Sequence, residues 1–154
     1  MTHLERARSA IGTCSYVLGA GGWDPASSVP GSRLAAEVAK KEGSERGCDC
    51  SGFVAWVINK SRKVTIVPGM WGISTDSIHR DASTAQAVFK RIDAPVAGCF
   101  AVYPDAGGKQ GHVAIVVDPV KRTIIDCSGS RNGITEHDGG YFWRKASTIW
   151  CVTL

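Results

Sequence analysis

Apolar and polar positions in the first half of the chain recur with the period of helices. Thr2, with Glu5 three positions later, predicts a capping box that opens a first helix. One face of this helix is apolar at Leu4, Ala7 and Ile11. Gly12, or the later glycines of "GAGG", would end it.

Three further helices are expected before residue 90. A loop rich in Pro, Gly and Ser, "GWDPASSVPGS", leads to an amphipathic helix over "RLAAEVAKKEG" that Gly43 ends. A helix over about 50–60 has inward apolar positions at Phe53, Val54, Val57 and Ile58. Another is capped by Thr75 or Asp76 and runs to about Phe89.

The second half of the chain carries the pattern typical of strands. Four short β-branched or aromatic runs are separated by turn residues: "GCFAVYP", "HVAIVVD", "RTIIDCS" and "STIWCVTL". The segments "PDAGGKQG" and "DPVKR" are typical of hairpin connections. Helices first and an antiparallel sheet second predict an α+β fold, with the helices packed on one face of the sheet.

The composition indicates an ordered globular protein and argues against several other classes. Hydrophobic residues make up 44% and charged residues 21% of the 154 positions, so residues 1–154 are expected to form one domain. The net charge of +4 is mild and does not indicate a nucleic-acid partner. No apolar run approaches the ~20 residues of a membrane span. The start, "MTHLERARSA", lacks the apolar core of a secretion signal.

The six cysteines do not form a recognisable scaffold or metal site. They are too sparse for a disulfide framework, although Cys14 and Cys151 near opposite ends are a candidate pair. Cys48 and Cys50 lie two apart, but a structural zinc site needs about four clustered ligands, and the other cysteines and the four histidines are dispersed. A bridge between Cys48 and Cys50 would close a strained loop. One reactive thiol is the better interpretation.

Cys50 lies where a loop becomes a helix. The free backbone N–H groups and the positive end of the helix dipole stabilise a thiolate there, and they can also hold a substrate oxyanion. Asp49 can cap this helix, and Ser51 is small enough to leave the sulfur accessible. These features are typical of a cysteine nucleophile.

His112 can supply the base that such a nucleophile needs. It opens the apolar strand "HVAIVVD", and a strand-borne imidazole beside a helix-borne thiolate is the arrangement of papain-like enzymes. His79 and His137 open no apolar strand and are weaker candidates. The next strand can pair antiparallel with the first, which would place Asp126 opposite His112 as its partner. Ser128, on the same face, is the alternative partner.

The segments "DCSGFV" and "GHVAIVVD", with the lead-in "ARSAIGTCSYVLGAGG", resemble the NlpC/P60 superfamily of papain-like cysteine peptidases. The matched pieces cover most of the chain in order, and residues 23–47 would form an insertion within the catalytic domain. The resemblance implies that Cys50 is the nucleophile, His112 the base and Asp126 the third member. It also implies that the Tyr16 hydroxyl lies near the oxyanion, whereas the other interpretation of Tyr16 is a core aromatic that ends the first helix.

The resemblance further implies hydrolysis of amide bonds in peptidoglycan stem peptides, next to γ-D-Glu and diaminopimelate, with no metal or cofactor. Arg131 could pair bidentately with a substrate carboxylate, or it could be a solvated turn charge. Ser51 and Ser128 are further candidates for contact with the substrate or the oxyanion. Two other functions stay open: an amidase, acyltransferase or deamidase on lipid or protein amides, and an inactive binding module.

The expected place of action is the cell wall or periplasm. No wall-binding repeat and no secretion signal are evident, which suggests another export route, as in a phage component or an antibacterial effector. An effector would have an immunity or inhibitor protein as its partner. We expect a monomer.

Overall fold

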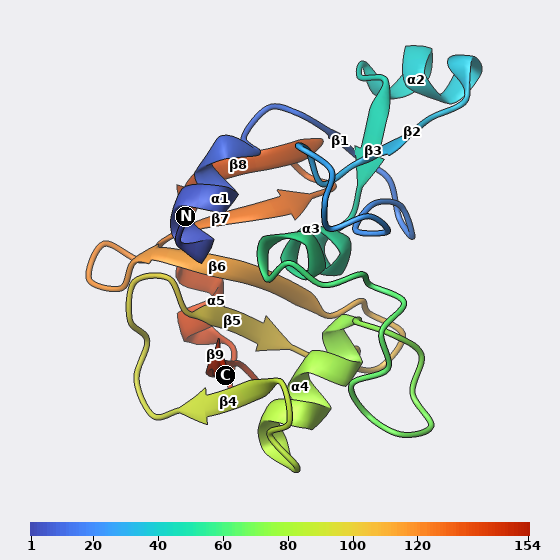
Figure 1. Ribbon diagram of the computed structural model, residues 1–154. Helices are drawn as coiled ribbons and strands as arrows, with labels where there is room; N and C mark the ends of the chain where they lie inside the picture. Colours follow the sequence, from blue (N-terminus) through green and yellow to red (C-terminus); the bar gives the residue numbers. More distant parts are fainter.

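The computed structural model describes residues 1–154 and contains five helices and two sheets. Figure 1 shows the larger sheet, six antiparallel strands in the order β4-β9-β5-β6-β7-β8, and a smaller sheet in the order β1-β3-β2. The helices are α1 (His3–Ser9), α2 (Ala36–Glu42), α3 (Cys50–Val57), α4 (Thr75–Ser83) and α5 (Gly140–Arg144). The strands are β1 (Ser15–Tyr16), β2 (Ser32–Arg33), β3 (Arg46–Cys48), β4 (Phe89–Ile92), β5 (Phe100–Tyr103), β6 (His112–Asp118), β7 (Thr123–Ser128), β8 (Gly133–Asp138) and β9 (Ile149–Thr153).

The two faces of the large sheet are covered differently. Helices α1, α3 and α4 cover one face, where Val113 and Ile115 of β6 join the larger apolar core. Alternate residues of the same strand point to the other face, where Ala114 packs in a smaller core with Phe142 of α5. The predicted α+β class is confirmed. Helix α5 on the opposite face was not predicted.

Every residue of α3 is buried, which explains its almost uniformly apolar sequence. The sheet covers one side of the helix, and α1 and the loop before β2 cover the other. Arg6 Nε donates to the Trp56 carbonyl at 2.8 Å, and its guanidinium lies 3.8 Å from the centre of the Trp56 ring. Trp56 Nε1 donates to the Ser27 carbonyl at 2.8 Å. The helix that carries Cys50 is therefore fixed on all sides.

Helix α1 ends at the first of the two predicted places. The capping box of Thr2 and Glu5 is present, with bonds of 2.6 and 3.1 Å. Gly12 then adopts a φ of +78°, a left-handed conformation that favours glycine and turns the chain away from the helix. As a result Tyr16 lies in β1, which pairs parallel with β3, and the interpretation of Tyr16 as the end of the first helix is wrong.

Helix α4 is shorter than predicted. Ser74, and not Thr75 or Asp76, is its N-cap. The helix ends at Ser83 because the buried carboxylate of Asp81 accepts backbone N–H groups of residues 87–89 and turns the chain into β4. The expected helix up to Phe89 is therefore wrong over its last six positions.

The hairpin of β6 and β7 is present, but its register differs from the prediction. A bulge around Val117 shifts the ladder, and Ile115 pairs with Ile125. If this register continues, Asp126 lies opposite the residue two positions after His112. The prediction that Asp126 lies directly opposite His112 is therefore wrong by two positions. The two side chains still share a face, because strand side chains alternate with a period of two.

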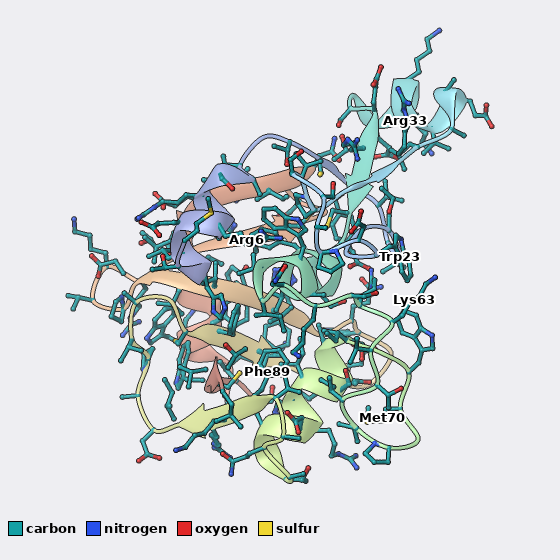
Figure 2. The ribbon with its side chains drawn as sticks, viewed as in Figure 1. Arg6, Trp23, Arg33, Lys63, Met70 and Phe89 are labelled. Atoms are coloured by element: carbon teal, nitrogen blue, oxygen red, sulfur yellow. The ribbon has the colours of Figure 1, made fainter.

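The segment 32–46 projects from the rest of the protein, as Figure 1 shows for β2 and α2 and Figure 2 for Arg33. It lies within the residues expected to form an insertion, 23–47. Helix α2 forms where it was predicted, buries none of its residues, and ends at Gly43 with a φ of +80°. None of the five helices has the length and apolar character needed to cross a membrane.

Candidate active site

Cys50 is the first residue of α3, and its helix start is built as the sequence indicates. Asp49 is the N-cap, and its Oδ1 accepts the Gly52 N–H at 2.8 Å. Its Oδ2 accepts the Gly19 N–H at 2.8 Å, which ties the lead-in loop to the helix. Cys50 is 8% exposed and lines a cavity of about 220 Å³ whose walls include Tyr16.

A buried ion pair that the sequence did not reveal supports this helix start. Arg62 Nη1 lies 2.8 Å from Asp49 Oδ1, and both side chains are 5% exposed. Arg62 Nη2 donates to the Ser51 hydroxyl at 2.9 Å. The Ser51 side chain is therefore held within this network and does not face the His112 side of the site. Arg62 lies in a loop with no local motif, so only the tertiary fold identifies it.

His112 lies at the beginning of β6 with its ring between two groups. Nε2 is 2.6 Å from Asp126 Oδ2, which leaves Nδ1 for the Cys50 side. Burial disfavours the charged ring. The hydrogen bond to Asp126 and the interactions with the Cys50 side chain outweigh burial and raise the pKa of His112 to about 10. The ring also stacks on Phe142, with centroids 5.7 Å apart. The arrangement favours a protonated imidazole beside the thiol.

Asp126 is fully buried and accepts three side-chain donors. Besides His112, these are His137 Nε2 at 2.8 Å from Oδ1 and the Tyr141 hydroxyl at 3.1 Å from Oδ2. Burial would raise the pKa of this carboxyl, but the hydrogen bonds and charges of the two histidines outweigh it and lower the pKa to about 2. Asp126 is therefore an anion at neutral pH and lies between two imidazole rings.

His137 is a site residue whose place the sequence reasoning missed. It lies on β8, where Thr135 pairs with Asp126, so His137 is two positions on and shares a face with Asp126. The segment "GITEHD" has few apolar residues and was not recognised as a strand. Had β8 been paired with β7, the alternation alone would have brought the two side chains together.

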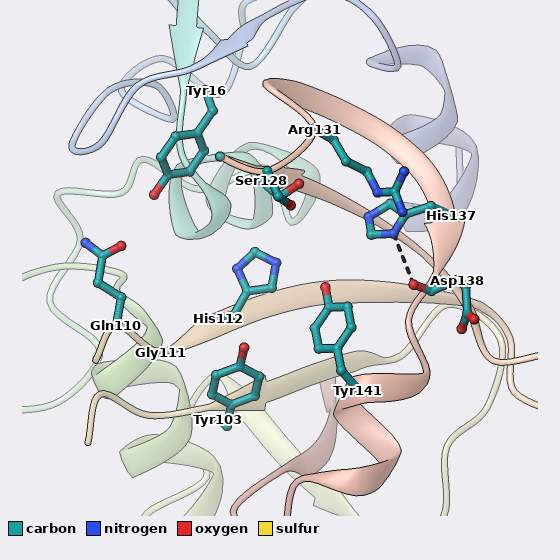
Figure 3. A pocket seen from close by; sticks show the side chains of 12 residues that line it. Tyr16, Tyr103, Gln110, Gly111, His112, Ser128, Arg131, His137, Asp138 and Tyr141 are labelled. Atoms are coloured by element: carbon teal, nitrogen blue, oxygen red, sulfur yellow. Dashed lines mark hydrogen bonds between the residues drawn. The ribbon is translucent and has the colours of Figure 1, made fainter. Parts of the chain in front are cut away.

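Ser128, the alternative partner for His112, does not bond to it. Its hydroxyl is buried and makes no hydrogen bond. It lines a cavity of about 480 Å³ together with His112 and Arg131. In Figure 3, Tyr16 lies on one side of His112, and Tyr103 and Tyr141 lie on the other. Of the predicted site residues, Tyr16, His112, Ser128 and Arg131 line this cavity, and Asp126 bonds to residues that do.

Tyr16, from β1, and Arg131, from the turn between β7 and β8, both line the cavity. Burial, with the Cys50 side chain as the next cause, raises the pKa of Tyr16 to about 12, so its hydroxyl stays a hydrogen-bond donor. Tyr16 also lines the smaller cavity beside Cys50 and so connects the two spaces. Arg131 is exposed and forms no ion pair with a carboxylate of the protein.

The other cysteines are buried free thiols. Cys14 and Cys151 are not bridged. Cys48 is fully buried, and its Sγ donates to the Asp49 carbonyl at 3.4 Å. Burial raises the pKa of the Cys48 thiol well above its usual range. Cys48 therefore acts as packing in this structure, in contrast to its neighbour Cys50 at the cavity.

Comparisons with known proteins bear on the fold of this chain. The sequence profile of the CHAP domain matches residues 39–130, a range that includes Cys50, His112 and Asp126. Among solved structures, the chain is similar to NlpC1 from Trichomonas vaginalis, with a TM-score of 0.52 and 16% identity over 96% of this chain and 44% of that one. The chain thus spans less than half the length of NlpC1, and the likeness shows the predicted NlpC/P60-like cysteine peptidase fold. No curated protein matches this sequence.

Proposed function

This chain belongs to the CHAP-domain family, a peptidoglycan-hydrolase and amidase type of family, and we propose that it is a cysteine hydrolase of peptidoglycan stem peptides. The observation that carries the proposal is the His112 ring, which bonds through Nε2 at 2.6 Å to buried Asp126 and whose pKa is raised by that bond and by the neighbouring Cys50 side chain. This order of thiol, imidazole and carboxylate matches the requirements of nucleophilic acyl transfer. The proposed catalytic domain is residues 1–154.

The proposed reaction has two stages, formation of a thioester at Cys50 and its hydrolysis by water. The Cys50 thiolate attacks the amide carbonyl carbon, and the resulting oxyanion is held by backbone N–H groups at the start of α3 and by the Tyr16 hydroxyl. His112 gives its proton to the leaving nitrogen, the C–N bond breaks, and a thioester remains. Water then attacks the thioester while His112 takes a proton, which releases the acid and regenerates the thiol. Asp126 keeps the ring oriented and stabilises its charge throughout.

The substrate proposal rests on the cavity of about 480 Å³ beside His112. His112 itself lines this cavity, and Arg131 brings an unpaired cation to its wall. Stem peptides carry free carboxylates next to their amide bonds, so we propose that Arg131 pairs with one of them. The bond between γ-D-Glu and diaminopimelate is the proposed point of cleavage. Ser128 lines the same cavity, although its unpartnered hydroxyl is buried.

The test is digestion of defined muropeptides followed by mass measurement of the products. Cys50→Ala should abolish cleavage, and Cys99→Ala, which changes a buried cysteine on the other face of the sheet, should keep it. Cleavage by the Cys50→Ala variant would contradict the proposal. If wild-type protein leaves muropeptides intact but cleaves lipid or protein amides, the substrate proposal is wrong and the thiol chemistry stands. If iodoacetamide labels Cys50 no faster than the buried cysteines, the protein is an inactive binding module.

We also propose that the site of action is the cell wall, reached as an exported antibacterial effector or from a phage particle. Expression in the periplasm of a bacterial host should then cause lysis, and expression in the cytoplasm should not. The Cys50→Ala variant is the matched control in both compartments. Equal harm in the two compartments would contradict this proposal without affecting the muropeptide result.

A further inference from the structure

The proposed reaction uses one side of Asp126, and the other side is occupied as well. Oδ2 faces His112 Nε2 at 2.6 Å, and Oδ1 faces His137 Nε2 at 2.8 Å. The carboxylate is 0% exposed, whereas the His112 and His137 side chains are 15% and 9% exposed. Two histidines from different strands thus hold one buried carboxylate, and only one of them interacts with Cys50.

The His137 ring is fixed at both of its nitrogens. Nδ1 lies 3.1 Å from the Asp138 carbonyl, the bond drawn as a dashed line in Figure 3, while Nε2 faces Asp126. Both partners are acceptors, so each ring nitrogen that carries a proton can donate to the group it faces. His137 lines the larger cavity but not the smaller one beside Cys50. His137 is therefore placed to contact Asp126 and not the Cys50 thiol.

Asp126 depends on such donors because its oxygens have no others besides Tyr141. Its three hydrogen bonds all come from side chains and none from the backbone. A carboxylate held from one side can rotate about its Cβ–Cγ bond and exchange its two oxygens. Donors at both oxygens fix the plane of the group. The remaining charged groups near His137 are Arg131, on the cavity wall, and the Asp138 carboxylate, which accepts the Gly140 N–H at 2.8 Å.

We propose that His137 is a positioning residue: by donating to Asp126 Oδ1, it keeps Oδ2 aimed at His112 and so keeps His112 oriented toward Cys50. This inference rests on the proposed function, because it assigns His137 a role in the same reaction. It predicts that loss of His137 lowers kcat and leaves KM nearly unchanged, since His137 acts through Asp126. Partners that orient a histidine from behind contribute about 10- to 100-fold to activity at metal sites, and we expect about 10-fold here.

The test uses chemical rescue, which a merely structural role would not show. His137→Ala should lower kcat on muropeptides about 10-fold, and added imidazole, which can enter the cavity, should restore a large part of it. His137→Gln retains an N–H donor and should lose less than His137→Ala. The matched control is His79→Ala, which removes a histidine bonded to the Ser147 carbonyl far from Asp126 and should keep kcat with or without imidazole.

Two outcomes would overturn the inference. One is a His137→Ala variant with wild-type kcat; the other is a low kcat that neither imidazole nor glutamine restores while thermal unfolding shows a folded protein. Alkylation of Cys50 distinguishes a failure of this inference from a failure of the proposed function. If no muropeptide is cleaved, the rate of iodoacetamide reaction at Cys50 still reports the His112 orientation. It should fall in His137→Ala and rise again with imidazole.

Discussion

Two carboxylates, Asp81 and Asp126, are both fully buried and each accepts three hydrogen bonds, yet their donors differ in kind. Asp81 accepts only backbone N–H groups, from Ala87, Val88 and Phe89 at 2.7–2.9 Å. Asp126 accepts only side chains, two of them imidazoles that line a cavity. Burial and bond count are equal, so neither quantity separates a structural carboxylate from one at the proposed active site.

The difference lies in what each carboxylate controls. Backbone donors fix the path of the chain, and Asp81 accordingly turns α4 into β4. Imidazole donors can gain or lose a proton, so Asp126 sets the charge and orientation of groups that can react. The Asp49 carboxylate lies between these cases, because it accepts two backbone N–H groups and two side chains, the Arg62 guanidinium and the Ser51 hydroxyl. It fixes the start of α3 and thereby the position of Cys50.

The sharpest test of this comparison replaces each carboxylate by alanine and measures turnover. Asp126→Ala should lower kcat on muropeptides by about 100-fold or more, because His112 loses the group that orients it and stabilises its charge. Asp81→Ala should keep the kcat of the folded protein within a few-fold of wild type. Equal losses of kcat in the two variants would show that the distinction between the donors has no functional meaning.

We expect the opposite order for the free energy of unfolding: Asp81→Ala should lose more stability than Asp126→Ala. Asp81→Ala leaves three backbone N–H groups without acceptors, that of buried Phe89 among them, which should lower the free energy of unfolding by about 3 kcal/mol. Asp126→Ala should cost less, because its histidine partners line a cavity and can bond to water. Urea denaturation of both variants and wild type measures the two costs. A larger loss for Asp126→Ala would contradict the structural role assigned to Asp81.

The pH dependence of stability provides a third test. The pKa of Asp126 is lowered from 3.8 to about 2, so its contribution is full above 3.8 and is lost as the pH falls toward 2. The pKa of His112 is raised from 6.5 to about 10, so its contribution is full below 6.5 and is lost as the pH rises toward 10. The stability difference between wild type and Asp126→Asn should therefore be largest between these limits, at about 2 kcal/mol. Urea titrations from pH 3 to 9 would reveal it, and a flat difference would contradict it.

The smallest expected effect concerns the third donor of Asp126. Tyr141→Phe removes one bond of 3.1 Å and keeps the ring that packs beside Phe142. We expect a loss of about 1 kcal/mol in stability and only a few-fold loss in kcat, because both histidines remain in place. The measurement is kcat and urea denaturation alongside His137→Ala. A Tyr141→Phe loss greater than that of His137→Ala would transfer the positioning role to Tyr141.

Much of the fold could be predicted because its signals are local. The capping box of Thr2 and Glu5, the Gly43 end of α2 and the apolar run of α3 each depend on neighbours within one or two turns. Strands β5, β6, β7 and β9 were recognised from β-branched runs. Strands β4 and β8 were missed because "FKRI" and "GITEHD" carry several polar residues; β4 pairs with the distant β9, and β8 pairs with the preceding β7.

By itself, the sequence placed Cys50 at a capped helix start and His112 at the start of an apolar strand, because helix caps and strand alternation depend on residues close together in the chain. It also named Asp126 as a partner, but in the wrong register. Only the tertiary structure decided that a bulge keeps Asp126 on the His112 face, that Arg62 neutralises Asp49, and that His137 holds the other oxygen of Asp126. Each of these depends on how strands and loops pair in the folded protein, and the residue types alone do not encode which donor satisfies a buried charge.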